Sequence, residues 1–275
     1  MGKAQTFPQE NQDLRHCGLD TQSHSLHVIK KVAFTLAEVL ITLGIIGVVA
    51  AMTLPTLINK YQEKVTVSKL KKVYSMLSQG YLFSVQEYGE PEGWGISGRD
   101  AGSSDEDEET YNAANAILVR NRLFKDLKKV QNCDNAKNQT ACDVPEKVYY
   151  ANGGQDSAMN SQTASSIMAD GTTFLVISNG ADLKYRGPGA LSKTYARIIV
   201  DLNGKKSPNT YGKDIFVFYL TNTNIMPEGT EKETHWSFTK CNSKGLGCTA
   251  WVIYNENMDY LHCNDLSWNG KKKCN

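Results

Sequence analysis

"KKVAFTLAEVLITLGIIGVVAAMTLP", residues 30–55, contains the one long apolar run of the chain. From Phe34 to Leu54 the only ionisable residue is Glu38. A helix needs about 20 apolar residues to cross a bilayer, whereas the apolar core of a secretory signal peptide is about 7–15 residues long. The stretch therefore predicts a membrane-spanning helix that is retained in the mature protein.

Glu38 is the unusual residue of this helix. A carboxylate inside a membrane helix costs about 2.5–3.5 kcal/mol, and no cationic residue lies within the apolar run. One interpretation is that Glu38 lies near the membrane interface and has no particular role. The other is that a partner outside the segment compensates its charge. The neighbouring residues favour the second interpretation.

These neighbours resemble the N-terminal signature of type IV prepilins and type II secretion pseudopilins. In that family a small residue precedes a Phe, a Thr-Leu dipeptide follows, and a Glu is the fifth residue after the cut. The matching residues here are Ala33, Phe34, Thr35, Leu36 and Glu38. Pro55 matches the proline that often ends the membrane part of the family's helix. The departures are Ala33, where glycine is more common, and a leader of 33 residues, longer than many.

The resemblance implies how the N-terminus is processed. A prepilin peptidase would cut between Ala33 and Phe34, which makes residues 1–33 a leader peptide, and a methyltransferase would then N-methylate Phe34. In an assembled filament, Glu38 would face the amine of Phe34 in a neighbouring subunit. The implied partners are copies of this chain or homologous pilins, the peptidase and methyltransferase, the assembly platform and its ATPase, and membrane lipid before assembly.

Three further residues shape the predicted membrane and assembly helix, residues 34–55. Gly44 and Gly47 are small enough to let neighbouring helices approach closely, although glycine is also common in ordinary membrane helices. Pro55 lacks the N–H of a helical residue and clashes with the preceding turn, so we expect a kink or local unwinding there.

An amphipathic continuation of the helix is predicted over residues 56–89. Its apolar residues recur at mostly three- or four-residue steps, as expected for one buried helix face. They are Tyr61, Val65, Leu70, Val73, Tyr74, Leu77, Tyr81, Val85 and Tyr88. Glycine and proline in "YGEPEGWG" predict the end of the helix near Tyr88.

Residues 90–275 read as an α+β head. A loop is predicted up to residue 110 and an amphipathic helix over 111–133. Short runs rich in β-branched and aromatic residues then predict strands: "KVYYA" (147–151), "TTFLVIS" (172–178), "YARIIVDL" (195–202), "DIFVFYL" (214–220), "HWSF" (235–238) and "TAWVIYN" (249–255). One long helix followed by antiparallel strands fits the pilin-like fold that the resemblance implies, with the sheet packed on the second half of the helix.

Seven cysteines bear on the compartment of the head. Cys17 precedes the apolar run, and the other six follow it: Cys133, Cys142, Cys241, Cys248, Cys263 and Cys274. An even set beyond a membrane segment predicts three disulfides in an oxidising compartment, with nearest neighbours paired. A zinc site is the alternative, but no CxxC pair occurs. The lysines on both sides of the apolar run do not decide its orientation, so the cysteines place the head outside the cytoplasm.

Two stretches of the head are candidates for binding. Asp201, Asn203 and Asp214 surround a glycine-containing turn and offer oxygen ligands for calcium, but turn geometry explains the same residues, and we favour it. The spacing of an EF-hand is absent. The second stretch lies near the C-terminus and is rich in aromatic residues and lysines. It forms either part of the core or a binding patch on the surface, and core packing is the commoner role. Its residues are Trp251, Tyr254, Tyr260, Trp268 and the terminal lysines. No other cofactor is indicated.

These observations predict a structural protein. It would be a pilin or pseudopilin of a type IV pilus-like or type II secretion filament, held before assembly as a single-pass inner-membrane protein with its N-terminus in the cytoplasm, and later part of a periplasmic or cell-surface filament. The alternative is a tip-located minor pilin that acts as an adhesin or in DNA uptake. No nucleophile elbow or HExxH motif indicates an enzyme, and the net charge of +1 does not indicate a nucleic-acid partner.

Overall fold

The computed structural model describes residues 35–96, 105–134, 142, 144–156, 164–178 and 185–274. The chain divides into two units, Met1–Met52 and Thr53–Asn275. Helix α1 (Leu36–Tyr88) contributes residues 36–52 to the first unit and residues 53–88 to the second, which is the head. Its end at Tyr88 agrees with the prediction, and Gly89 follows with a φ of 74°.

The head is built on one antiparallel sheet of six strands in the order β1-β4-β5-β6-β7-β8. The strands are β1 (Lys129–Cys133), β4 (Ala164–Met168), β5 (Thr173–Ser178), β6 (Thr194–Asp201), β7 (Ile215–Thr221) and β8 (Ile225–Pro227). β2 (Val148–Tyr149) and β3 (Gln155–Asp156) pair separately. Strands β5 to β7 form the centre of the sheet, and every residue of β7 is buried.

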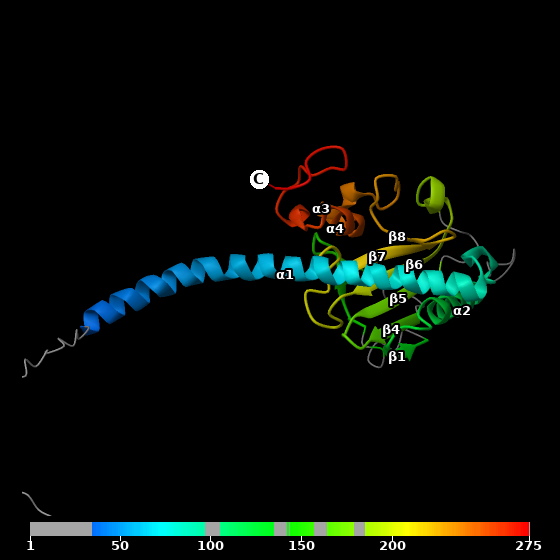
Figure 1. Cartoon of the computed structure of the whole chain (residues 1–275), viewed down its shortest axis with the longest axis horizontal. Coiled ribbons are helices and arrows are strands. Elements are labelled where there is room, and N and C mark those ends of the chain that lie inside the picture. The colour runs from blue at the N-terminus through cyan, green and yellow to red at the C-terminus, as the bar shows by residue number, and fades with distance from the viewer. Residues whose placement is uncertain are drawn as a thin grey trace, which may run out of the picture. The chain divides into compact units, whose positions relative to one another are not determined.

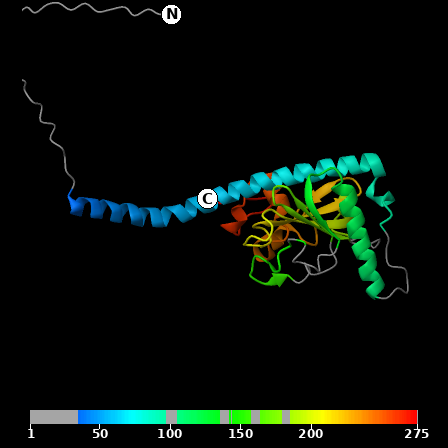
Figure 2. The same cartoon turned by 90° about the horizontal axis from the view of Figure 1, so that it is seen from below.

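Two helices cover one face of this sheet (Figure 1). The buried residues of α1 within the head, Val67, Leu70, Val73, Leu77 and Tyr81, join one core with alternate residues of the strands. Tyr74 stacks on Phe218 of β7 with ring centroids 5.8 Å apart. Helix α2 (Asp105–Leu123) packs beside α1 on β4 and β5, at a steep angle to α1 (Figure 2).

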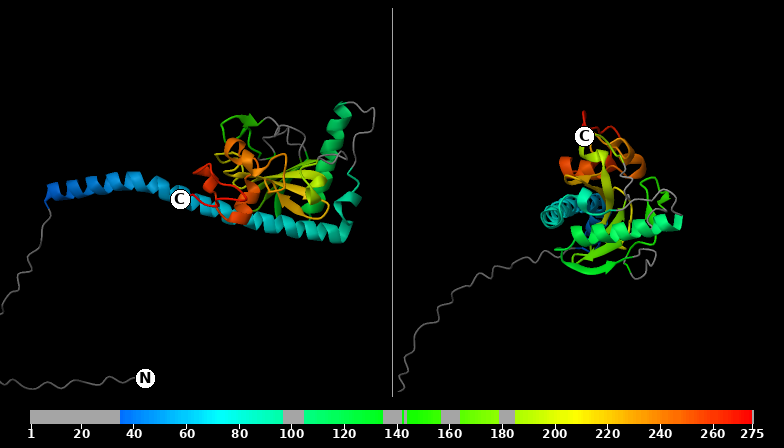
Figure 3. Two further views of the ribbon diagram at one scale, coloured as in Figure 1. Left: turned by 90° about the horizontal axis from the view of Figure 1, so that it is seen from above. Right: turned by 90° about the vertical axis from the view of Figure 1, so that its right-hand side faces the viewer.

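The opposite face of the sheet is also covered, by loops and short elements. Leu175, Ile199, Val217 and Tyr219 point to this second core, where they meet Leu191 and residues of the turn before β7. The sheet therefore lies between a helical layer and a layer of loops, seen edge-on in the right-hand view of Figure 3. Burial on both faces explains why the central strands read as continuous apolar runs.

The C-terminal lobe, residues 238–274, contains α3 (Cys241–Lys244) and α4 (Thr249–Asn255). It rests on residues 53–88 of α1 through two polar contacts at its surface. Glu256 accepts a hydrogen bond from Lys71, and the His262 ring nitrogen lies 2.8 Å from the carboxylate of Glu63.

The α+β class is confirmed, and four strand predictions coincide with β2, β5, β6 and β7. The helix predicted over 111–133 is wrong at both ends: α2 runs from Asp105 to Leu123, and residues 129–133 form β1. Residues 105–109 of the predicted loop are thus the acidic N-terminus of α2, where the helix dipole favours negative charge.

Two predicted strands in the C-terminal part are also wrong. "TAWVIYN" forms α4, and "HWSF" runs into a short 3₁₀ helix, Phe238–Lys240. β-Branched and aromatic residues suit any well-packed buried site, so their strand propensity yields to tertiary contacts. Here Trp251 and Val252 are fully buried, and they lie on a helix.

Candidate functional site: the apolar segment of helix α1

The first part of α1, residues 36–58, is an apolar segment with no cover from the described part of the chain. Its large apolar side chains are exposed by half or more, apart from Val39 at 42%. They are Leu36, Val39, Leu40, Ile41, Leu43, Ile45, Ile46, Val48, Val49, Met52, Leu54, Leu57 and Ile58. Among the residues that the structure describes, α1 is the one helix long and apolar enough to cross a membrane. A soluble monomer rarely exposes so large an apolar surface, so the segment needs lipid or other helices around it.

The N-terminus of α1 is closed by a capping box. Thr35 precedes the first helical residue, and its N–H and hydroxyl both donate to Glu38 Oε2 at 2.9 Å. The Glu38 N–H donates back to Thr35 Oγ1 at 3.2 Å. The T-x-x-E spacing of Thr35 and Glu38 is the sequence signature of this capping box. Glu38 therefore has a partner within the segment, and Ala33 and Phe34 lie outside the described residues.

Gly44 and Gly47 have no packing role within the described residues. A Cβ at either position would meet no described atom within 4 Å beyond the adjoining helix backbone. Gly80, on the same helix, is different, because its Cβ would lie 2.5 Å from the Leu123 carbonyl oxygen at the end of α2. A glycine inside a helix costs about 1 kcal/mol relative to alanine. At Gly80 the close approach of α2 offsets this cost. At Gly44 and Gly47 only contacts with other molecules would offset it.

The local unwinding predicted at Pro55 is absent. Every residue from Leu36 to Tyr88 is helical, with Pro55 inside the helix. Proline removes only one hydrogen bond, to the carbonyl of Ala51, and the flanking turns keep the rest of the helical ladder. The other effect predicted for Pro55, a kink of the helix, stays a prediction.

The calcium candidates in the head do come together. In the sheet, Asp201 at the end of β6 pairs with Ile215 of β7. Asp214 directly precedes Ile215 and so lies beside Asp201. The two oxygens of Asp214 accept the N–H groups of Thr210 at 2.7 Å and Asn209 at 2.9 Å, and Asp201 accepts the N–H of Asn203 at 3.0 Å. Burial raises the pKa of Asp214, while these backbone hydrogen bonds oppose the rise. The carboxylates thus shape the turn, which is the favoured interpretation from the sequence, and calcium binding stays the untested alternative.

A groove of about 580 Å³ borders this turn. It is lined by residues 59–69 of α1, by the turn with Asn203 and Asp214, and by residues 258–262 of the C-terminal lobe. Among the described residues, no group of three or more His, Cys, Asp or Glu side chains is arranged to hold a metal ion.

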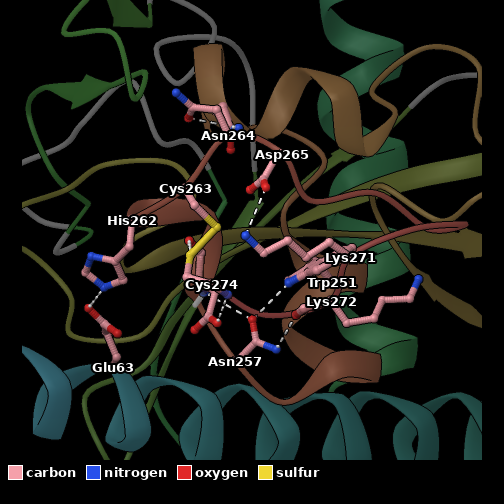
Figure 4. The surroundings of a disulfide bond; sticks show 12 residues. Glu63, Trp251, Asn257, His262, Cys263, Asn264, Asp265, Lys271, Lys272 and Cys274 are labelled. Atoms are coloured by element: carbon pink, nitrogen blue, oxygen red, sulfur yellow. Dashed lines mark hydrogen bonds and ion pairs between the residues drawn. A yellow bond between two sulfur atoms is a disulfide. The ribbon is translucent and has the colours of Figure 1, made fainter.

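Three disulfides join nearest neighbours, as predicted: Cys133–Cys142, Cys241–Cys248 and Cys263–Cys274. Bonded sulfur atoms are not thiolate ligands, so these six cysteines do not form the alternative zinc site. Figure 4 shows the Cys263–Cys274 bond, which closes the last segment of the chain beside the His262–Glu63 pair. Cys17 lies outside the described residues.

The C-terminal aromatic residues belong mainly to the core. Trp251 and Tyr260 are buried and Trp268 is half-buried, which leaves Tyr254 as the exposed member of the group. Lys272 lies over the rings of Trp251 and Trp268, 5.4 and 5.2 Å from their centroids. The core alternative is therefore confirmed for Trp251 and Tyr260.

Residues 56–264 match the model of a family of unknown function (DUF6613). The match begins one residue after Pro55 and covers the second part of α1 and most of the head. No curated protein and no solved structure matches the chain significantly.

Proposed function

The chain belongs to this family, whose function is unknown, and we propose from its own residues that it is a structural subunit of a filament. It would be a pilin or pseudopilin of a type IV pilus-like or type II secretion assembly. The observation that carries this proposal is the apolar segment, residues 36–58, which is helical, exposed and preceded by the prepilin-like residues Ala33 and Phe34.

Before assembly the apolar segment lies in the inner membrane as a single span. The N-terminus faces the cytoplasm, where a prepilin peptidase cuts and a methyltransferase modifies Phe34. The disulfides of the head support a location outside the cytoplasm, because disulfides persist in oxidising compartments. An assembly platform and its ATPase then move the apolar segment from lipid into a bundle of like helices. The periplasmic or cell-surface filament is the product.

Glu38 has a different partner in each of these two states. In the single chain it accepts hydrogen bonds from Thr35, which partly offsets the cost of a carboxylate near lipid. In the filament its charge faces the methylated amine of Phe34 in the neighbouring subunit. Both partners remain after cleavage, because the cut precedes Phe34. The charge is fully compensated only in the bundle, so Glu38 favours assembly over dispersal in the membrane.

The mature protein is expected to begin with N-methylated Phe34. Mass spectrometry of the N-terminal peptide, from protein purified from its native membrane, measures both the cut and the added methyl group. In a Phe34→Ala variant, the same measurement tests whether methylation depends on phenylalanine at the N-terminus. An N-terminus after Ala51, as signal-peptide cleavage would produce, contradicts the filament proposal.

Substitutions at Thr35 and Glu38 separate the capping role of Glu38 from its charge. Glutamine also completes a capping box, so Glu38→Gln keeps the helix start and removes only the charge. We expect this variant to insert into the membrane normally but to enter filaments at least about tenfold less, because the partner amine is left unpaired in an apolar bundle. Membrane fractionation and quantification of sheared filaments measure the two steps.

Thr35→Ala is the matched control. It removes the cap, at a cost of about 1 kcal/mol in helix stability, and keeps the charge of Glu38. Filament incorporation should therefore stay closer to wild type than in Glu38→Gln. The reverse order, with Glu38→Gln assembling normally and Thr35→Ala failing, would show that Glu38 serves only to cap the helix.

A further inference from the structure

The head contains a buried pair of carboxyl groups, Glu228 and Glu233, in the segment that follows β8. Their residues are 1% and 3% exposed. Buried acids of this kind are rare unless they are paired and fully hydrogen-bonded, so their surroundings show which protonation state the fold accepts.

The two carboxyl groups meet at one hydroxyl group. The Tyr219 hydroxyl oxygen lies 2.8 Å from an oxygen of Glu228 and 2.8 Å from an oxygen of Glu233. A phenol has a single hydrogen and donates it to one acceptor at a time. The second short contact therefore needs a hydrogen from a carboxyl group. A chain in which protonated Glu233 donates to Tyr219, and Tyr219 donates to ionised Glu228, satisfies both distances.

The remaining carboxyl oxygens accept backbone N–H groups. Glu228 Oε2 accepts the N–H of Gly247 at 3.0 Å, and Glu233 Oε2 accepts that of Gly229 at 2.6 Å. Glu233 Oε1 also accepts the N–H of Trp236 at 3.1 Å. The acidic hydrogen is therefore carried by the carboxyl oxygen that faces the Tyr219 hydroxyl group.

The nearby charges favour ionisation of Glu228 over Glu233: burial raises the pKa of Glu228, and the Arg197 guanidinium opposes that rise. The Arg197 guanidinium of β6 lies 3.6 Å from Glu228 Oε1, and the Arg186 guanidinium lies 5.6 Å from the centre of the Tyr219 ring. A second acid, Asp156, also interacts with the charge of Arg197. The Tyr211 hydroxyl donates a hydrogen bond to Asp156 at 2.8 Å. Two arginines thus balance Asp156 and Glu228. An ionised Glu233 would add a third, uncompensated negative charge.

The carboxyl pair joins two parts of the chain. Glu228 binds Gly247 of the C-terminal lobe through its side chain, and its carbonyl accepts the N–H of Ala250 at 2.8 Å. The Trp268 ring N–H donates to the Gly229 carbonyl at 3.0 Å. A Cβ at Gly229 would lie 1.8 Å from the Gly247 carbonyl oxygen, so these backbones are in direct contact.

We propose that Glu228, Tyr219 and Glu233 share one proton and form a pH-sensitive latch that holds the C-terminal lobe against the end of β8. Loss of the shared proton places two negative charges on one hydroxyl group and loosens residues 228–236 from Gly247 and Trp268. The latch is a property of the head and does not depend on the proposed filament.

The sign of the pH dependence follows from the buried acid. Burial, together with the neighbouring Glu228 carboxylate, raises the pKa of Glu233 to about 7. A pKa that is higher in the folded state gives a stabilisation that is complete below the ordinary value of 4.5 and is lost as the pH rises through about 7. The latch is therefore closed in mildly acidic medium and opens in alkaline medium.

Thermal unfolding of the full chain in detergent tests the latch. We expect the wild-type Tm to be about 5 °C lower at about pH 8.5 than at about pH 5.5. Glu233→Gln keeps the shape and removes the titration, so less than half of that difference should remain. Glu231→Gln, at an exposed residue of the same segment, is the matched control and should keep the full difference. A Glu233→Gln variant as pH-dependent as wild type overturns the proposal.

Infrared spectroscopy of the wild type keeps the proposal testable if Glu233→Gln does not fold. The C=O band of a protonated buried carboxylic acid should be present at about pH 5.5 and disappear with a midpoint near neutral pH, together with the hydrogen-exchange protection of Gly247. A spectrum without such a band at about pH 5.5 would show that both acids are ionised and that no proton is shared.

Discussion

Replacing Trp251 with alanine is expected to lower the free energy of unfolding of the head by about 3–5 kcal/mol. Trp251 is fully buried on α4 and stacks on Phe238, with ring centroids 4.1 Å apart and planes 11° from parallel. Its ring also contacts Trp268 at 5.2 Å, and its N–H donates to Asn257 at 3.0 Å. Truncation removes all of these contacts and leaves a cavity in the C-terminal lobe.

Urea denaturation followed by circular dichroism measures this loss. Tyr254→Ala is the matched control, because Tyr254 lies three residues later on the same helix and is 54% exposed. It should cost less than about 1 kcal/mol. Equal losses in the two variants would mean that Trp251 is not the aromatic centre of the lobe.

Replacing Gly80 with valine is expected to destabilise the head by about 2–3 kcal/mol. The new Cβ would lie 2.5 Å from the Leu123 carbonyl oxygen, a backbone atom that cannot rotate away. Ser84, one turn later, reinforces the same junction, because its hydroxyl lies 2.9 Å from the Arg122 carbonyl oxygen. The close approach of α1 and α2 must therefore open, and Ser84 loses its contact with α2.

Gly93→Val is the control for the general effect of replacing a glycine in the head. A Cβ at Gly93 would meet no atom of the described residues within 4 Å. Its Tm should stay within about 2 °C of the wild type. A Gly80→Val protein with the same Tm as Gly93→Val would show that the α1–α2 junction adapts without cost.

Local patterns predicted the parts of the fold that depend on neighbours along the chain. The end of α1 at Tyr88 follows from the glycines and proline that come after it, and the central strands follow from their apolar runs. The pairing of cysteines 7 to 11 residues apart also agrees with short loops in the chain. The same reasoning failed for "TAWVIYN", because its β-branched and aromatic residues fit a buried helix as well as a buried strand.

The candidate site also has features that the local sequence predicts and features that require the three-dimensional structure. The apolar segment and the position of Glu38 within it are readable from composition, and the T-x-x-E spacing also indicates the cap. Among the described residues, a Cβ at Gly44 or Gly47 would meet no packed neighbour, whereas one at Gly80 would, and only the three-dimensional neighbours of each helix face reveal this difference.

Residue types and their spacing are enough to predict an apolar helix suited to a membrane, an α+β head and disulfides between nearby cysteines. These features depend on spacing over a few turns or strands. The meeting of Glu228 and Glu233 at Tyr219, and the place of Trp251 in the core, are visible only in the folded chain. Such contacts arise when segments far apart in the chain are packed together, and no local pattern specifies them.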